Sequence, residues 1–197
     1  MPNKIELLDH AVEVLRRGDA LTLDAVAREA GVTKPGVVHH FGTKDGLWHE
    51  TVREAVSWYR DRVFDPVDGS SAGERLRWYF REYIRFSAHH PDFFRMMTQE
   101  NTLRSERLEW LVETHVGATV TRTIAMIEAA QQEGAFIAGD PMQLLYLFLG
   151  AATSPYRSSA EIMLLTGRSP EEPAQVEAHV LACERLFFRD PPAPQIR

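Results

Sequence analysis

The sequence lacks several features that define common protein classes. Cys183 is the only cysteine among 197 residues, so neither an intrachain disulfide nor a cluster of thiolate metal ligands can form. The most apolar run, residues 144–152, is far shorter than the ~20 residues that cross a bilayer. The first 19 residues carry charges throughout and lack the apolar core of a signal peptide. We therefore expect a cytoplasmic protein with no membrane partner.

A net positive charge is also absent. The formal charge is -6, so any contact with nucleic acid requires a local patch rather than the whole surface. The hydrophobic fraction of 44%, with 10% aromatic residues, is sufficient for a buried core and argues against a disordered chain.

The motifs of common enzymes are missing as well. The sequence contains no HExxH, GxSxG, Walker or GxGxxG motif, and no histidine follows an acid by three residues as di-iron helical bundles require. The adjacent His39 and His40 would point about 100° apart on a helix, which opposes chelation of one ion. We predict no catalytic residues, no cofactor and no metal ligand, and keep a helical enzyme as an alternative.

Apolar residues recur at helical spacing along the whole sequence. Ile5, Leu8, Val12 and Leu15, with Ala11, form the first such stripe, and Gly18 can end that helix. No run of alternating β-branched residues predicts a strand. About nine helices are expected, at residues 5–17, 23–30, 34–41, 44–63, 74–89, 91–100, 105–133, 141–165 and 174–188. Ser154-Pro155 is expected to interrupt or kink the eighth, and residues 65–73 are expected to form a loop.

Two short helices near the N-terminus predict a helix-turn-helix. Thr22, Thr33 and Thr43 are suitable N-caps, and Gly31 can make the sharp turn between the first two helices. Pro35 falls in the first turn of the second helix, where its missing N–H removes no hydrogen bond. Val37 and Phe41 would face inward, and the outward side is left to Thr33, Lys34, Gly36, Val38 and His39, with His40 near the rim.

The charge pattern agrees with this surface contacting phosphates. Residues 30–44 contain no acid, although the flanking chain is acidic, and Lys34 and Lys44 fall within that window. Carboxylates there would repel a nucleic-acid backbone.

The segment VAREAGVTKPGVVHHFGTKDGL, residues 26–47, resembles the DNA-binding signature of the TetR family, and the likeness extends from residue 5 to about 48. The resemblance implies a homodimer on double-stranded operator DNA and a small-molecule effector that releases it. Val38 stands where the family usually has tyrosine, and it is expected to pack against a thymine methyl group. The residues that the resemblance implies in DNA binding are Thr22, Thr33, Lys34, Gly36, Val38, His39, His40 and Lys44.

The larger C-terminal part is rich in aromatic residues and methionine, which suit a core and also an adaptable apolar pocket. The ligand pocket is predicted from Tyr83, Phe86, Phe93, Met97, Asn101, Trp110, His115 and Tyr146. The last two long helices hold more apolar residues than one bundle needs, which predicts an isologous dimer, with an intramolecular core as the alternative. The dimer residues are predicted to be Phe148, Ala152, Met163, Val176, Val180 and Phe187.

The sequence as a whole predicts an all-α regulator. Residues 1–48 are assigned to an N-terminal three-helix helix-turn-helix DNA-binding domain, residues 49–190 to a helical ligand-binding and dimerisation bundle, and residues 191–197 to a flexible tail. We expect a transcriptional repressor released from its operator by a small, largely apolar ligand. A helical interaction module with a vestigial helix-turn-helix is the main alternative.

Overall fold

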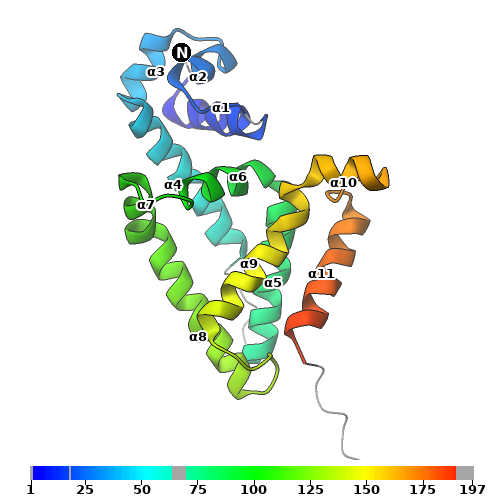
Figure 1. Ribbon diagram of the computed structural model, residues 1–197. Coiled ribbons are helices and arrows are strands. Elements are labelled where there is room, and N and C mark those ends of the chain that lie inside the picture. Colours follow the sequence, from blue (N-terminus) through cyan, green and yellow to red (C-terminus); the bar gives the residue numbers. More distant parts are fainter. Residues whose placement is uncertain (1, 18, 64–69, 190–197) are drawn as a thin grey trace, which may run out of the picture.

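The computed structural model describes residues 2–17, 19–63 and 70–189, which form an all-helical protein (Figure 1). In this described part, the only β feature is an isolated antiparallel bridge between Phe136 and Phe188, so the predicted all-α class is confirmed. The elements are α1 (Lys4–Arg16), α2 (Leu23–Glu29), α3 (Lys34–Phe41), α4 (Lys44–Val63), α5 (Ala72–His89), α6 (Pro91–Glu100), α7 (Glu106–Leu111), a π-helical turn η1 (Val112–Val116), α8 (Gly117–Gln132), α9 (Pro141–Arg157), α10 (Ser159–Thr166) and α11 (Pro173–Phe187).

Some predictions concern residues outside the described part. These are the helix end at Gly18, most of the loop at 65–73 and the tail at 191–197. The described end of that loop differs from the prediction, because α5 begins at Ala72 rather than at Glu74. Ser71 and Glu74 form a capping box there, in which each side chain accepts a hydrogen bond from the other residue's backbone N–H.

The buried stripe of helix α1 agrees with the predicted one in part, because it shares Leu8 and Ala11. Leu7, Leu8, Ala11 and Val14 are buried, whereas Ile5 is 70% exposed. Both stripes are apolar at helical spacing, so periodicity alone does not separate them. Packing against α2 and α4 selects the buried one.

The helix-turn-helix is built as its sequence predicts. Gly31 adopts a positive φ of 65° between α2 and α3, a conformation in which glycine carries no Cβ penalty. Val37 is fully buried and Phe41 nearly so, which holds α3 against the first hydrophobic cluster. Helix α3 therefore has a fixed orientation with its other face in solvent.

Helix α4 connects the two parts of the molecule (Figure 1). Its first half contributes Leu47, Trp48 and Val52 to the cluster shared with α1–α3, and Tyr59 near its other end belongs to the second cluster. The predicted division at residue 48 thus falls within one continuous helix, and that boundary stays a prediction. A displacement of α4 would move α3 as well.

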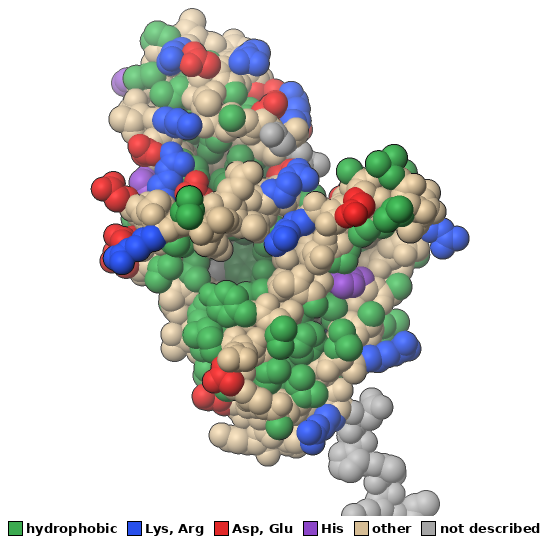
Figure 2. All heavy atoms as spheres, viewed as in Figure 1, with side chains coloured by type: hydrophobic (Ala, Val, Ile, Leu, Met, Phe, Trp, Pro, Cys, Tyr) green, Lys and Arg blue, Asp and Glu red, His purple; other side chains and the backbone are tan. Residues whose placement is uncertain are grey.

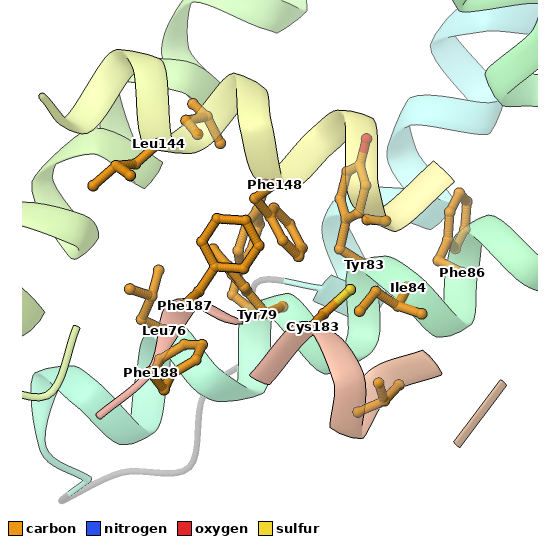
Figure 3. Close-up of a cluster of buried hydrophobic side chains, with 14 of the residues drawn as sticks. Leu76, Tyr79, Tyr83, Ile84, Phe86, Leu144, Phe148, Cys183, Phe187 and Phe188 are labelled. Carbon is orange, nitrogen blue, oxygen red and sulfur yellow. The ribbon is translucent and has the colours of Figure 1, made fainter. Parts of the chain in front are cut away.

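The second cluster lies among α5, α8, α9 and α11, and hydrophobic side chains also cover much of this part's outer face (Figure 2). Aromatic rings from three helices point toward one another inside it (Figure 3). Phe80 of α5 stacks on Phe148 of α9 with ring centroids 3.4 Å apart, and Phe187 of α11 meets Phe80 edge-on. This packing fixes the helices that surround the cavity described below.

The segment predicted as one helix at residues 105–133 contains a wider turn. The π-helical turn η1 separates α7 from α8, and these three elements follow one another without a gap. Single π-turns of this kind occur frequently at functional sites. Here the turn carries His115, which lines the cavity between α6, α8 and α9.

Candidate nucleic-acid interface and ligand cavity

Helix α3 presents the surface predicted to face DNA. Thr33, Lys34, Val38 and His39 are exposed, and His40 and Gly36 are half-buried beside them. All of these residues project from one short helix, whose buried side is fixed by Val37 and Phe41. The structure therefore leaves this predicted group distributed around the part of α3 that Val37 and Phe41 do not bury.

The three threonines at helix starts play different local roles. The Thr22 hydroxyl accepts a hydrogen bond from the Ala25 N–H at 3.1 Å, and the Thr43 hydroxyl accepts one from Gly46 at 3.0 Å. Thr33 occupies the N-cap position of α3, but its side chain makes no capping hydrogen bond. The Thr33 hydroxyl is therefore left for a phosphate, whereas the N–H groups of Gly36 and Val37 already donate to the Thr33 carbonyl oxygen.

Two glycines near α3 have different explanations. A Cβ added to Gly36 would meet only the Thr33 hydroxyl, at an ordinary contact distance of 3.7 Å, so nothing within the chain requires glycine there. Glycine nevertheless weakens a helix interior by about 1 kcal/mol relative to alanine. A Cβ at Gly46, by contrast, would collide with the carbonyl oxygen of Phe41. The sequence did not single out Gly46, which has an internal role.

Lys34 is engaged within its own chain. Its Nζ lies 2.8 Å from the Asp24 carboxylate at the start of α2, and both side chains are more than half exposed. A solvent-exposed pair of this kind contributes only about 0–1 kcal/mol, so a DNA phosphate can compete for the lysine.

A cavity of about 400 Å³ lies among α4, α5, α6, α8 and α9. Figure 2 shows a hollow below α6 with hydrophobic side chains around it. Six of the eight predicted pocket residues line this cavity: Tyr83, Phe93, Met97, Asn101, His115 and Tyr146. Its size falls within the ~300–1,000 Å³ of small-molecule sites.

The other two predicted pocket residues are placed elsewhere. Phe86 is buried in the second cluster, where its ring packs against Tyr59 and Phe94. Trp110 packs against Trp48 rather than facing the cavity. Periodicity marks both as inward-facing residues but does not say which packed neighbours surround them.

The sequence missed a row of tyrosines and threonines in the wall. The hydroxyls of Tyr59 and Tyr79 are 3.0 Å apart, and Tyr79 also hydrogen-bonds Thr123. Burial raises the pKa of the lining tyrosines Tyr59, Tyr79 and Tyr83, so these three stay protonated and can donate. Their helical spacing on α4 and α5 was indistinguishable from that of core residues.

Aromatic contacts connect the cavity to α4. The His115 ring lies 5.1 Å from the Trp110 ring, which lies 4.3 Å from His49 and 5.8 Å from Trp48. Both His49 and Trp48 belong to α4. A change at His115 therefore has a path of packed rings to the helix that adjoins α3.

An ion-pair bridge runs beside these rings. Arg107 of α7 binds Asp45 in the first turn of α4 and also Glu100 of α6, the latter at 3.2 Å. Its guanidinium lies over the Trp48 ring, 4.9 Å from the centroid. The Arg107 guanidinium holds the pKa of Asp45 below its usual value, so this carboxylate stays ionised at neutral pH.

The predicted dimer residues need correction. Five of them are buried in the chain's own core and present almost no surface to a partner: Phe148, Ala152, Val176, Val180 and Phe187. Met163 alone is exposed, at 49%. The sequence therefore selected the inward side of α9 and α11. The outward apolar residues of α9, α10 and α11 are Met142, Tyr146, Leu147, Met163, Leu164, Leu165, Leu181 and Leu186.

The described residues hold neither a metal-binding cluster nor a membrane-spanning helix. No group of three or more histidine, cysteine, aspartate or glutamate side chains in them could hold a metal ion. None of the helices in residues 2–17, 19–63 and 70–189 is long and apolar enough to cross a membrane.

Comparison with known families decides the relationship. Residues 7–51 match the family described as "Bacterial regulatory proteins, tetR family", and residues 73–183 match the "Tetracyclin repressor-like, C-terminal domain". The chain belongs to the TetR family. This TetR-family protein is thus a DNA-binding transcriptional regulator, as the helix-turn-helix predicted. No curated protein matches it by sequence.

Solved structures share the fold of this TetR-family chain. The structure of AibR with isovaleryl coenzyme A and operator DNA superposes with a TM-score of 0.76 at 19% identity, covering 94% of this chain and 97% of AibR. A putative transcriptional regulator, SCO4942 from Streptomyces coelicolor, gives 0.70 at 20% identity, with 94% and 98% covered. The ketosteroid regulator KstR2 of Mycobacterium tuberculosis gives 0.68 at 19% identity, with 95% of each chain covered.

Proposed function

We propose that this regulator is a homodimeric repressor whose operator affinity falls when a small, largely apolar ligand occupies the cavity among α4, α5, α6, α8 and α9. The observation that carries the proposal is the contact path from that cavity to α4. His115 lines the cavity, its ring packs on Trp110, and Trp110 packs on Trp48 and His49. AibR, a structural neighbour, was solved with both an acyl thioester and operator DNA, which supports the pairing of the two activities.

The mechanism follows from where α4 lies. Ligand in the cavity would displace the π-turn that holds His115 and, through Trp110, shift the first half of α4. Because α3 packs directly on α4, its position relative to the partner's α3 would change. Two recognition helices on successive major grooves need a separation of roughly 34–36 Å, so a shift of a few ångströms is enough to weaken binding.

The DNA contacts are proposed residue by residue. Thr22, Thr33 and Lys44 would bind phosphates, Lys34 a phosphate or a base edge, and His39 the bases or the backbone. Val38 would meet a thymine methyl group, Gly36 would permit close approach, and His40 would lie at the rim. The acid-free residues 30–44 support this placement on α3 and the start of α4.

The dimer is proposed through the outward faces of α9, α10 and α11. Leu164 and Leu165 of α10 are 88% and 78% exposed, and Leu181 and Leu186 of α11 more than half exposed. Large apolar side chains exposed together on a monomer support an interface. A family made up of regulators favours a role without catalysis.

DNA-binding experiments test this proposal. Fluorescence anisotropy with DNA from around the protein's own gene should show sequence-selective binding by a dimer, with affinity that falls as salt increases. Lys44→Ala should weaken binding to all sequences and reduce the salt slope by about 1. His39→Ala should change the preference among operator variants. Binding without sequence preference, or no binding by the dimer, would contradict the proposal.

A further inference from the structure

The described wall of the ligand cavity contains one charged side chain and no acid. That side chain is Arg157, in the last turn of α9. The remainder of the described wall is aromatic, aliphatic or uncharged polar. A wholly apolar ligand in this cavity would cover the Arg157 guanidinium and remove its water without offering a partner, which costs free energy. The cation at the cavity edge therefore favours a ligand with a negative group.

The Arg157 side chain is available to a ligand. It forms no ion pair with any acid in the described residues, whereas Arg81, Arg85 and Arg107 of the same bundle are each paired with a carboxylate. A cation in a last helical turn also complements the helix dipole. That effect explains a positive charge at this end of α9, but it does not explain why the residue lines the cavity.

The hydroxyl groups of the cavity wall determine which hydrogen bonds a ligand can form there. Thr98, Thr119, Thr123 and Thr153 each donate to the carbonyl oxygen four residues earlier, at 2.8–3.0 Å, so they can only accept from a ligand. The donors that remain include the Tyr83 hydroxyl, which has no hydrogen-bond partner among the described residues, and the side-chain amide of Asn101.

We propose that the cavity binds an apolar organic acid, with the apolar body among the aromatic residues and the negative group on Arg157. The inference rests on the proposed function only in taking this cavity as the effector site. Two sources share this chemistry: the carboxylate of a free acid, and a phosphate group joined to an apolar acyl chain in a thioester. Arg157 acts as the specificity-determining residue, since it distinguishes an anion from a neutral analogue of the same shape.

Calorimetric titration of the purified protein tests this inference. The ligands are decanoate, its neutral analogue decanamide, and decanoyl coenzyme A. We expect decanoate or the thioester to bind about tenfold more tightly than decanamide, which corresponds to about 1.4 kcal/mol. If the thioester binds and decanoate does not, the anion recognised is a phosphate group.

Variants isolate the role of the charge. Arg157→Gln should weaken binding of the favoured anion about tenfold and leave decanamide unchanged, and Arg157→Lys should retain most of the affinity. Arg168→Gln is the matched control, because Arg168 is also exposed and lies outside the wall of this cavity. Equal binding of acid and amide, no effect of Arg157→Gln, or no binding by either anion would overturn the inference.

Operator release measured in the same solutions separates this inference from the proposed function. If decanamide binds and releases the operator as well as the anions do, the ligand-controlled repressor stands and the acidic class is wrong. If an anion binds through Arg157 but operator affinity does not change, the site assignment stands and the proposed function is wrong.

Discussion

The imidazole of His179 on α11 lies against α9, with its Nε2 3.1 Å from the carbonyl oxygen of Ala151. Ala151 precedes Pro155 by four residues, and proline has no N–H to donate to that carbonyl within the helix. His179 supplies the missing donor, which fixes its tautomer with a hydrogen on Nε2. Helix α9 therefore continues through Pro155 to Arg157, which places Arg157 beside the cavity.

Removing this donor should destabilise the fold. His179→Ala leaves the Ala151 carbonyl without its partner and should lower the free energy of unfolding by about 1–3 kcal/mol in urea denaturation. His179→Gln keeps an N–H donor near the same position and should lose less. His89→Ala, at an exposed histidine in the last turn of α5, is the control and should stay close to wild type. A fully stable His179→Ala variant would show that the carbonyl finds another donor.

The same histidine should make stability depend on pH. Burial is the main cause that lowers the pKa of His179 below its ordinary 6.5. The unfolded chain thus binds a proton at a higher pH than the folded chain. The contribution of neutral His179 to the free energy of unfolding is therefore complete above about pH 6.5 and declines as the pH falls toward the pKa of the folded state. The neighbouring Cys183 does not titrate in that window, because burial raises its pKa to about 11. Urea midpoints of wild type and His179→Gln, compared from pH 7.5 to 5, should converge at the acidic end.

The ion pairs of Arg107 between α4 and α7 should affect the coupling between the ligand cavity and the DNA-binding surface. They should affect the affinity of each site measured alone much less. Arg107→Gln removes the contacts with Asp45 and Glu100, but it touches neither the cavity wall nor α3. We expect ligand and operator affinities measured separately to change less than about threefold. The effect of decanoate or its thioester on operator affinity should shrink several-fold, since typical coupling energies are about 1–3 kcal/mol. Arg104→Gln, whose partner is the exposed Glu109, should leave the coupling intact.

Asp24 should restrain DNA binding. Asp24→Asn frees Lys34 and removes a carboxylate near the proposed phosphate path, so affinity for all DNA sequences should rise about two- to tenfold, with a steeper salt dependence. The melting temperature should hardly change, because the pair is exposed. A loss of affinity would mean that Asp24 positions Lys34 for its contact.

Val38 occupies the position at which the resemblance to the TetR family predicts a tyrosine. Its side chain is 37% exposed on the outward face of α3, so a larger side chain fits there without repacking the core. Val38→Tyr should increase affinity for most DNA sequences through an added phosphate contact, while Val38→Ala should lower affinity mainly for operators with thymine at the contacted position. Equal loss of affinity by Val38→Ala on every operator would argue against a thymine contact.

Local features of the sequence were enough to predict the helix-turn-helix. The caps at Thr22 and Thr43, the turn at Gly31 and the anchors Val37 and Phe41 depend on neighbours within a few residues, which the sequence displays directly. For the same reason α4 begins at Lys44, as predicted. Six cavity residues were also found, because a mixed aromatic and polar composition marks them.

The tertiary structure decided which side of each apolar helix is buried. On α1 the sequence favoured Ile5, and on α9 and α11 it took Phe148 and Phe187 for surface residues, because a helix that is apolar on several sides has no unique inward face. For the same reason the sequence wrongly assigned Trp110 to the cavity wall and did not identify Tyr59 and Tyr79 as wall residues. Contacts between distant residues, such as Arg107 with Asp45 and His179 with Ala151, depend on how whole helices pack, and no local pattern encodes that distance. The sequence by itself therefore determined the DNA-binding unit, and only the packing of the helices decided what lines the cavity and how it is joined to α4.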